Sequence, residues 1–345
     1  MYIMLKSKDI IHSGFAIALI LLSSYVGNRF RQSFGERTND EYDLIKKYLL
    51  NESPLYGMNK PKIWIHTKYD INARNWKESH ARNTHNLNQP YLHLTIQSII
   101  DHCGDDFHVC LIDDKTFSNL IPGWEVDVSI LAEPMKSQIR ELALAQLVYI
   151  YGGMLVPNSF ICTKNLKSIY ADGLYGGTPF VCEKINRTAN LLEQKHKTLF
   201  IPDLYFMGAK REDATMYELV EYLKSRNKSL HSSFEPTFLG ESNQWCLDSI
   251  RSKKMNLIGG ERIGIKTKGG KQILLEDLME EKDLDLSTDC CGVYIPADEV
   301  LRRTKYNWLA FISKYELLKS DIAISRYIGM TSAYRPSIIP SAVSL

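Results

Sequence analysis

The sequence has no excess of charge of either sign, and this absence removes one large class of partner. The chain carries 42 Lys+Arg against 40 Asp+Glu, a formal net charge of +2 over 345 residues. Domains that bind nucleic acid normally concentrate positive charge on one face or along one helix. We therefore expect no nucleic acid as the main partner of this protein.

Metal-binding cysteine pairs are also missing. The cysteines number 7, an odd count, and no two of them stand in a CxxC spacing, which makes a thiolate metal site unexpected. Most lie in apolar, strand-like runs such as "FHVCLIDD" and "PFVCEK", where a small buried thiol is the expected state. Adjacent Cys290 and Cys291 are poor partners for one another, although either could pair elsewhere.

Several common motifs are absent as well. The sequence contains neither a phosphate loop with a GK[ST] pair opening a helix nor a GxSxG nucleophile motif. We find no internal repeat and no low-complexity tract. The remaining composition, 44% hydrophobic and 24% charged, is that of an ordinary globular protein.

One hydrophobic run stands near the N-terminus. Residues 10–26, "IIHSGFAIALILLSSYV", carry no charged side chain, and Lys6, Lys8, Arg29 and Arg31 flank them. As a helix this run spans about 25 Å, slightly less than the hydrocarbon core of a membrane, about 30 Å. We expect an uncleaved signal anchor, with a cleaved signal peptide and a buried soluble helix as alternatives. Because positive residues lie on both sides, the orientation stays open.

The anchor implies a single-pass membrane protein. Its compartment stays open, with an endomembrane and a virion as the two candidates. The predicted parts are a short tail, the anchor, a polar stalk, a globular body and a second tail: 1–9, 10–27, 28–58, 59–330 and 331–345. Within the body we separate an N-terminal part, 59–210, from a C-terminal part, 211–330.

Strand and helix patterns alternate along the body. "KIWIH" (62–66) is typical of a short strand, "PYLHLTIQSIIDH" (90–102) of a helix that opens on proline, and "FHVCLIDD" (107–114) of a buried strand. Such strand–helix–strand units build right-handed parallel sheets. We therefore predict an α/β fold, with a mostly parallel sheet and helices on both of its faces.

A second helix is predicted to end at a double glycine. "KSQIRELALAQLVYIYGG" (136–153) has apolar residues at helical spacing, and Gly152 and Gly153 end the pattern. The apolar face consists of Ile139, Leu142, Ala143, Leu147 and Ile150. Further strands are expected in "SFICT", "PFVCEK" and "LYFMGAK", and a hairpin in "IGIKTKGGKQILL".

The order of these parts resembles the GT-A-fold glycosyltransferases with a sugar-binding DxD region, a family that includes initiating mannosyltransferases and capsular polysaccharide synthesis proteins. The likeness covers about residues 60–170 and rests on "PKIWIH", "NQPYLHLTIQSIIDHCGDDFHVCLIDD", "QIRELALAQLVYIYGGML" and "SFICTKNL". It implies a GT-A fold and transfer of a sugar from a UDP- or GDP-linked donor to a glycan or protein acceptor. The C-terminal "GVYIPADEVLRRTKYNW" is similar to proteins of large DNA viruses, a likeness that implies no function.

The resemblance also implies a donor site. In the family the first strand and its loop hold the nucleotide, and a helix arginine lies near the nucleotide-sugar. The acids after the glycines chelate Mn²⁺ or Mg²⁺, which neutralises the leaving diphosphate. The positions carried over to nucleotide-sugar binding are Ile65, His66, Thr67, Arg140, Gly152, Gly153, Asn158 and Ser159.

The chain departs from the family where the metal would bind. The two chelating acids fall on Pro157 and Ser159, and the acid one helical turn before the arginine is Ser137. Proline offers no side-chain ligand, and neutral serine and asparagine are weak ligands for a hard cation. The sequence therefore predicts that the usual DxD metal site is lost, and it names no certain cofactor.

Other residues are candidates to compensate. Asp113 and Asp114 follow a strand, and ligands gather at the carboxyl ends of strands in open α/β sheets. These two residues could bind the ribose or a metal, and Asp114 is also a candidate catalytic residue. The alternative is that both side chains cap the next turn. Glu183 is the candidate base that would activate an acceptor hydroxyl; the alternative is that it is a solvated residue at the end of a strand. A basic hairpin could neutralise a diphosphate or be one solvated face: Arg262, Lys266, Lys268 and Lys271.

Two functions follow from these residues. The first is a membrane-anchored glycosyltransferase. The second is a catalytically inactive glycosyltransferase-like domain that serves as a binding or structural protein, associated with a membrane or virion. Loss of one electrostatic stabiliser typically costs about 10² to 10³ in rate, so the missing acids favour the second. The retained framework fits both, and a generic α/β sheet without this ancestry is the third interpretation.

Overall fold

The computed structural model describes residues 60–67, 89–184, 200–228 and 241–331. All of them belong to one of the two units into which the chain divides, Pro54–Leu345. The expected anchor and stalk lie outside the described residues. No helix within the described ranges is long and apolar enough to cross a membrane.

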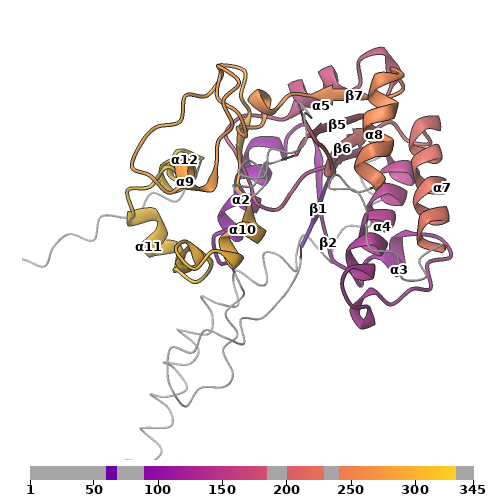
Figure 1. Cartoon of the computed structure of the whole chain (residues 1–345), viewed down its shortest axis with the longest axis horizontal. Coiled ribbons are helices and arrows are strands. Elements are labelled where there is room, and N and C mark those ends of the chain that lie inside the picture. The colour runs from indigo at the N-terminus through magenta and orange to yellow at the C-terminus, as the bar shows by residue number, and fades with distance from the viewer. Residues whose placement is uncertain (1–59, 68–88, 185–199, 229–240, 332–345) are drawn as a thin grey trace, which may run out of the picture. The chain divides into compact units, whose positions relative to one another are not determined.

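A six-stranded, mostly parallel sheet lies at the centre of this unit (Figure 1). Its strand order is β2-β1-β3-β6-β5-β7. The strands are β1 Lys62–His66, β2 His108–Ile112, β3 Gly153–Leu155, β5 Phe180–Glu183, β6 Pro202–Ala209 and β7 Asn256–Ile258. Only β6 runs antiparallel to its neighbours in this sheet. The predicted α/β class with a mostly parallel sheet is therefore confirmed.

Helices pack on both faces of the sheet, as expected. The helices in the described part of the chain are α2 Leu92–Cys103, α3 Phe117–Leu120, α4 Met135–Tyr151, α5 Lys167–Gly173, α7 Ala214–Lys228, α8 Glu241–Arg251, α9 Leu275–Leu278, α10 Ala297–Arg302, α11 Lys314–Lys319 and α12 Ala323–Thr331. Val181 of β5 belongs to the core cluster that contains α4 and α7, while its neighbour Phe180 meets Tyr170 of α5. Because successive strand residues point to opposite faces, these two contacts place helices on both sides.

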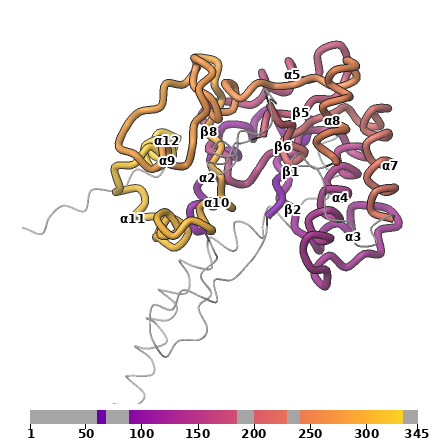
Figure 2. Tube along the Cα trace, in the orientation of Figure 1, coloured from indigo at the N-terminus to yellow at the C-terminus, as the bar shows by residue number. Residues whose placement is uncertain are grey.

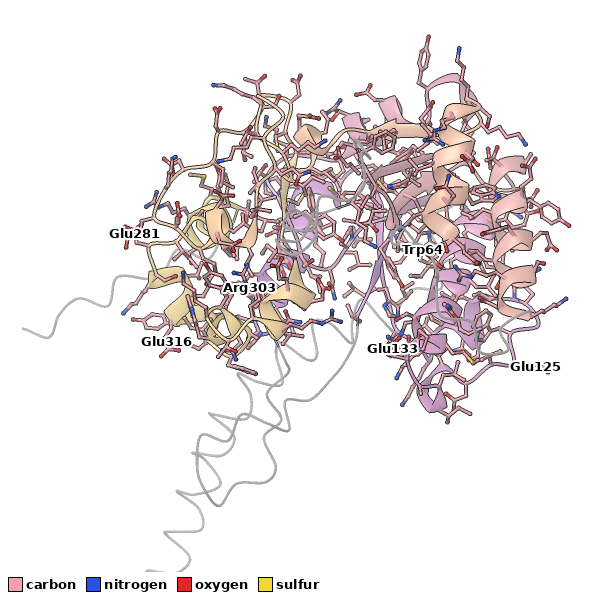
Figure 3. The ribbon with its side chains drawn as sticks, in the orientation of Figure 1. Trp64, Glu125, Glu133, Glu281, Arg303 and Glu316 are labelled. Atoms are coloured by element: carbon pink, nitrogen blue, oxygen red, sulfur yellow. The ribbon has the colours of Figure 1, made fainter. Side chains whose placement is uncertain are left out.

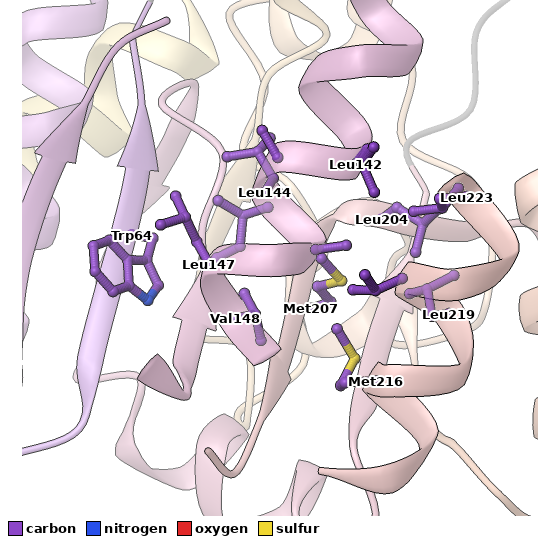
Figure 4. Packing of buried hydrophobic residues seen from close by; sticks show 14 of the residues in the cluster. Trp64, Leu142, Leu144, Leu147, Val148, Leu204, Met207, Met216, Leu219 and Leu223 are labelled. Atoms are coloured by element: carbon purple, nitrogen blue, oxygen red, sulfur yellow. The ribbon is translucent and has the colours of Figure 1, made fainter. Parts of the chain in front are cut away.

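Helix α4 lies between the sheet and α7, and this position explains which of its residues are buried. Figure 4 shows Leu142, Leu144 and Leu147 between Trp64 of β1 and the leucines of α7. The predicted apolar face included Ile139 and Ile150, but these are only partly buried, whereas Leu144, Ala145 and Val148 are fully covered. A helix packed on two sides buries a wider sector than the single stripe read from the sequence.

A second, two-stranded sheet joins β4, Phe160–Cys162, to β8, Gly292–Tyr294. "SFICT" therefore forms a strand as predicted, but it pairs outside the main sheet. The Cα trace shows β8 near α2 (Figure 2). Around this ribbon a second core contains Ile161 together with apolar residues of α9, α10, α11 and α12. The C-terminal helices thus pack on α2 and β4.

Elements on both sides of residue 210 build the main sheet and its layers, because β7, α7 and α8 come from the C-terminal part. The predicted hairpin is also present. Lys266 and Gln272 form an antiparallel bridge, and Ile273 N donates to Ile265 O at 2.9 Å. Gly270 has a φ of 79°, which a side chain rarely adopts, so glycine suits this turn.

Candidate functional site

The candidate site lies at the carboxyl edge of the parallel strands. His66 ends β1, Asp113 and Asp114 follow β2, and Glu183 ends β5. The antiparallel strand β6 starts at this edge, because Pro202 pairs with Glu183. Open α/β sheets bind ligands at this edge, so the fold collects the acids named from the sequence in the expected region.

Three residues from separate elements meet there. Arg140 of α4 donates from Nε to Oδ1 of Asp114 at 2.8 Å and from Nη2 to Oδ2 at 2.5 Å. His66 Nε2 lies 3.0 Å from the same Oδ1, and its ring stacks on Phe117 with 5.6 Å between the centroids. Asp114 therefore holds the end of β1 and the first half of α4 in one hydrogen-bonded cluster, His66–Asp114–Arg140.

This arrangement keeps Asp114 ionised. Burial would raise the pKa of Asp114, but the hydrogen bonds from Arg140 and His66 outweigh it and hold that pKa well below the ordinary value. Burial alone would lower the pKa of Arg140, but the hydrogen bond to Asp114 outweighs burial and raises that pKa above its ordinary value. A carboxylate with so little affinity for a proton is better suited to orienting Arg140 than to accepting a proton. Its catalytic role stays a prediction.

Glu133 supplies a carboxylate that sequence reasoning missed. It precedes α4 (Figure 3), and its Oε2 accepts a hydrogen bond from Ser137 Oγ at 2.5 Å. Its Oε1 lies 3.9 Å from Arg140 Nη1, and its side chain is 57% exposed. Glu133 thus brings a negative charge from the preceding turn to Ser137, the position where the resemblance led us to expect an acid. A comparison that matches single sequence positions does not reveal a carboxylate supplied by a residue four positions earlier.

The other residues of the predicted nucleotide loop have structural partners. Ile65 is fully buried within the sheet. Thr67 bonds the end of β2 twice, donating from N and from Oγ1 to Ile112 O at 2.8 and 3.2 Å. Asp113 Oδ1 accepts hydrogen bonds from Thr116 N at 2.9 Å and from Thr116 Oγ1 at 2.6 Å. Asp113 thus caps the turn, the alternative left open by the sequence.

The double glycine has a structural explanation of its own. Gly152 and Gly153 have φ values of 68° and 99°. A Cβ on Gly152 would lie 2.7 Å from Arg211 N, and one on Gly153 would overlap Lys62 O of β1. Gly152 O also accepts a hydrogen bond from Trp64 Nε1 at 3.0 Å. Their place in the motif therefore follows from close packing between α4, β3 and β1.

The family's metal does not fit the side chains at the end of β3. Ser159 is buried, and its Oγ donates to Ile295 O at 2.9 Å. The backbone oxygen of Asn158 accepts a hydrogen bond from Thr95 Oγ1 at 2.5 Å. Pro157 has no donor atom, so this turn joins β4 to the C-terminal part and presents no acidic ligand. Nor do the described residues contain any group of three His, Cys, Asp or Glu side chains arranged to hold a metal.

Glu183 is buried in an ion pair. Its Oε1 lies 2.5 Å from Lys266 Nζ, and its Oε2 accepts a hydrogen bond from Gly260 N at 3.0 Å. Both side chains are largely covered, at 4% and 15% exposure. Glu183 therefore attaches the hairpin to β5 through both of its oxygens, and its role as a base toward an acceptor stays a prediction.

Replacement of Lys266 by methionine should lower the free energy of unfolding by about 3 kcal/mol, because Glu183 would keep a buried charge without its cation. The double variant Lys266→Met/Glu183→Gln should recover most of this loss. Urea unfolding monitored by circular dichroism measures both. The matched control is Lys268→Met, whose exposed pair with Asp285 should contribute nothing measurable. A double variant no more stable than Lys266→Met would contradict the ion-pair explanation.

Two further cations of the basic hairpin also form ion pairs. Arg262 Nη1 lies 2.9 Å from Asp172 Oδ2, and Lys268 Nζ lies 2.8 Å from Asp285 Oδ1. Three of its four cations thus have carboxylate partners within the domain. These pairs favour the interpretation of the hairpin as an ion-paired face over its interpretation as a cluster of cations that neutralises a diphosphate.

One buried acid escaped the sequence reading. Asp203 of β6 lies beside Cys182 in the register, and its Oδ2 accepts a hydrogen bond from Tyr294 Oη at 3.1 Å. Burial raises the pKa of Asp203 above its ordinary value. Tyr205 N donates to its Oδ1 at 3.0 Å. The sequence signal for this residue is a single acid at the start of the apolar run "PDLYFMGA". The predicted strand, "LYFMGAK", begins after that acid.

Comparison with known proteins adds no name to this geometry. No protein-family model, curated protein or solved structure matches the chain. The likeness to GT-A glycosyltransferases therefore rests on the quoted sequence segments alone.

Proposed function

We propose that this protein is a membrane-anchored, glycosyltransferase-like protein that binds a nucleotide-sugar at the carboxyl edge of its sheet without a DxD metal. The observation that carries the proposal is the His66–Asp114–Arg140 cluster. The resemblance names His66 and Arg140 as donor-site residues from distant segments, and both are bonded to one carboxylate. The mostly parallel sheet agrees with the fold class that the resemblance implies.

Arg140 is the residue proposed to meet the donor. Asp114 holds it through Nε and Nη2, so the guanidinium keeps a fixed orientation, and Nη1 is on the side of Glu133. Glu133 is more than half exposed, and its Oε1 lies 3.9 Å from Arg140 Nη1 while its Oε2 is bonded to Ser137. A donor phosphate could take its place beside Arg140 at little cost, since an exposed ion pair contributes about 1 kcal/mol or less. Arginine is well suited to this role because its planar fork matches phosphate oxygens.

Calorimetric titration of the full chain in detergent with UDP- and GDP-sugars tests the proposal. We expect binding to one donor class, with the same affinity in Mn²⁺ and in a chelator. Glu133→Gln should strengthen that binding several-fold by removing the competing carboxylate. Binding that requires Mn²⁺ would contradict the metal-free site. Absence of binding to every donor would overturn the proposal altogether.

The second candidate function is an inactive domain used for binding or as a structural component. It is favoured by a specific observation: Glu183, the candidate base, has both oxygens engaged by Lys266 and Gly260. A product assay separates the two functions. Donor binding with neither sugar transfer nor donor hydrolysis would support the inactive domain, whereas turnover would support the transferase.

A further inference from the structure

Two buried cysteines from distant parts of the chain lie side by side. Cys103 is the last residue of α2 and Cys162 is the last residue of β4. Their Sγ atoms are 3.8 Å apart, although 59 positions separate them in the sequence. Both side chains are completely covered. The fold therefore juxtaposes two thiols that no sequence spacing connects.

The neighbouring contacts hold these two elements in place. Cys162 N donates to Ser98 Oγ of α2 at 2.8 Å, and Asn165 Nδ2 donates to His102 O at 2.8 Å. The helix end and the strand end are thus tied together on both sides of the sulfur atoms. A disulfide has an S–S distance of about 2.05 Å, so closure requires the two sulfurs to approach by less than about 2 Å.

We propose that Cys103 and Cys162 form a structural disulfide when the domain folds in an oxidising compartment. This inference is independent of the proposed donor site.

The oxidant is a disulfide donor, either oxidised glutathione or a protein disulfide oxidoreductase. The thiolate of either cysteine can react first; with Cys103 first, it attacks one sulfur of the donor, a mixed disulfide forms, and one donor thiolate leaves. That thiolate takes the proton of Cys162, whose sulfur then attacks Cys103 and displaces the second donor thiolate. The two cysteines lose two electrons and the donor disulfide gains them. Because both sulfurs are covered in the folded domain, the exchange belongs to folding, before α2 and β4 close over them.

The test uses cell-free synthesis of the full chain in detergent, with oxidised glutathione and a disulfide isomerase or with a reductant. Remaining thiols are alkylated in denaturant, and the digest is analysed by mass spectrometry. The expected result is a linked peptide pair containing Cys103 and Cys162 only in the oxidising reaction. Buried Cys182 and Cys246 are the matched controls and should be fully alkylated in both reactions. Alkylation of Cys103 and Cys162 to the same extent as these controls, or a link from either to another cysteine, would overturn the proposal.

Thermal unfolding gives a second measurement. A link across a loop of this length should raise the Tm by about 10 °C in the oxidised protein relative to the reduced protein. The difference should vanish in Cys103→Ser and persist in Cys246→Ser. A Tm difference that persists in Cys103→Ser would contradict the assignment, and the mass measurement on the unaltered chain decides the matter if that variant fails to fold.

Discussion

Replacement of Arg140 by methionine should weaken nucleotide-sugar binding by about 10- to 100-fold, because a hydrogen bond to a charged group contributes about 1.5–3 kcal/mol. The same change should lower the free energy of unfolding by about 3 kcal/mol, since Asp114 would keep a half-buried charge with only His66 beside it. Calorimetric titration and urea unfolding measure the two effects on the same sample.

A second buried arginine separates these two effects. Arg226 of α7 donates from Nη2 to Glu141 Oε2 at 2.9 Å, and its side chain is 5% exposed. Arg226→Met should therefore destabilise the domain to a similar extent while leaving donor binding unchanged. Equal loss of binding in both variants would mean that Arg140 acts only through stability, and the donor-site assignment would fail.

The cluster also predicts a pH dependence of stability. The pKa of Asp114 in the folded state lies below that of an unfolded aspartate, about 3.9. Its contribution is therefore complete above about pH 5 and is lost as the pH falls through the folded value. The stability difference between the wild type and Asp114→Asn should shrink as the pH falls from about 5 through the folded value. A difference that does not shrink in this acid range would show that Asp114 is not the stabilised carboxylate.

Replacement of Gly153 by alanine should destabilise the domain by at least about 4 kcal/mol, in the range where point variants no longer fold well. Gly153 combines a φ of 99° with a backbone of β1, at Lys62, that leaves no room for a Cβ. A Cβ there would overlap Lys62 O, so β3 would have to move away from β1. Thermal unfolding and the yield of folded protein measure the loss.

Gly270 is the matched control for this change. It shares a positive φ of 79°, but a Cβ built on it meets nothing within 4 Å. Gly270→Ala should therefore cost only the backbone term, about 1–2 kcal/mol. If both alanine variants lose the same stability, the strained φ alone explains the double glycine, and the close approach of β1 contributes nothing.

The segments "KIWIH", "FHVCLIDD" and "KSQIRELALAQLVYIYGG" predicted local elements well because their signals are short-range. The strands at "KIWIH" and "FHVCLIDD" and the helix ending at Gly152 occupy the expected positions. What the sequence did not predict is how the turn after β3 is used. Ser159 bonds Ile295, more than a hundred residues later, and no local pattern points to that partner.

Candidate acids illustrate the same limit. Asp113 and Asp114 are adjacent and identical in type, yet one caps its own turn and the other binds Arg140. The sequence suggested Glu183 as a base toward an acceptor hydroxyl, whereas the structure shows it in a buried ion pair with Lys266. Which carboxylate meets which cation depends on long-range packing, which residue type and spacing do not encode.

By itself the sequence determined the α/β class, the parallel start of the sheet and the helix before the double glycine. Periodicity and turn residues are local properties, so a single chain reveals them. Only the tertiary structure decided that His66, Asp114 and Arg140 form one cluster and that Cys103 lies against Cys162. Those contacts arise because α4 brings Arg140 to Asp114 after β2 and α2 packs on β4, and their free energy depends on burial that no single segment carries.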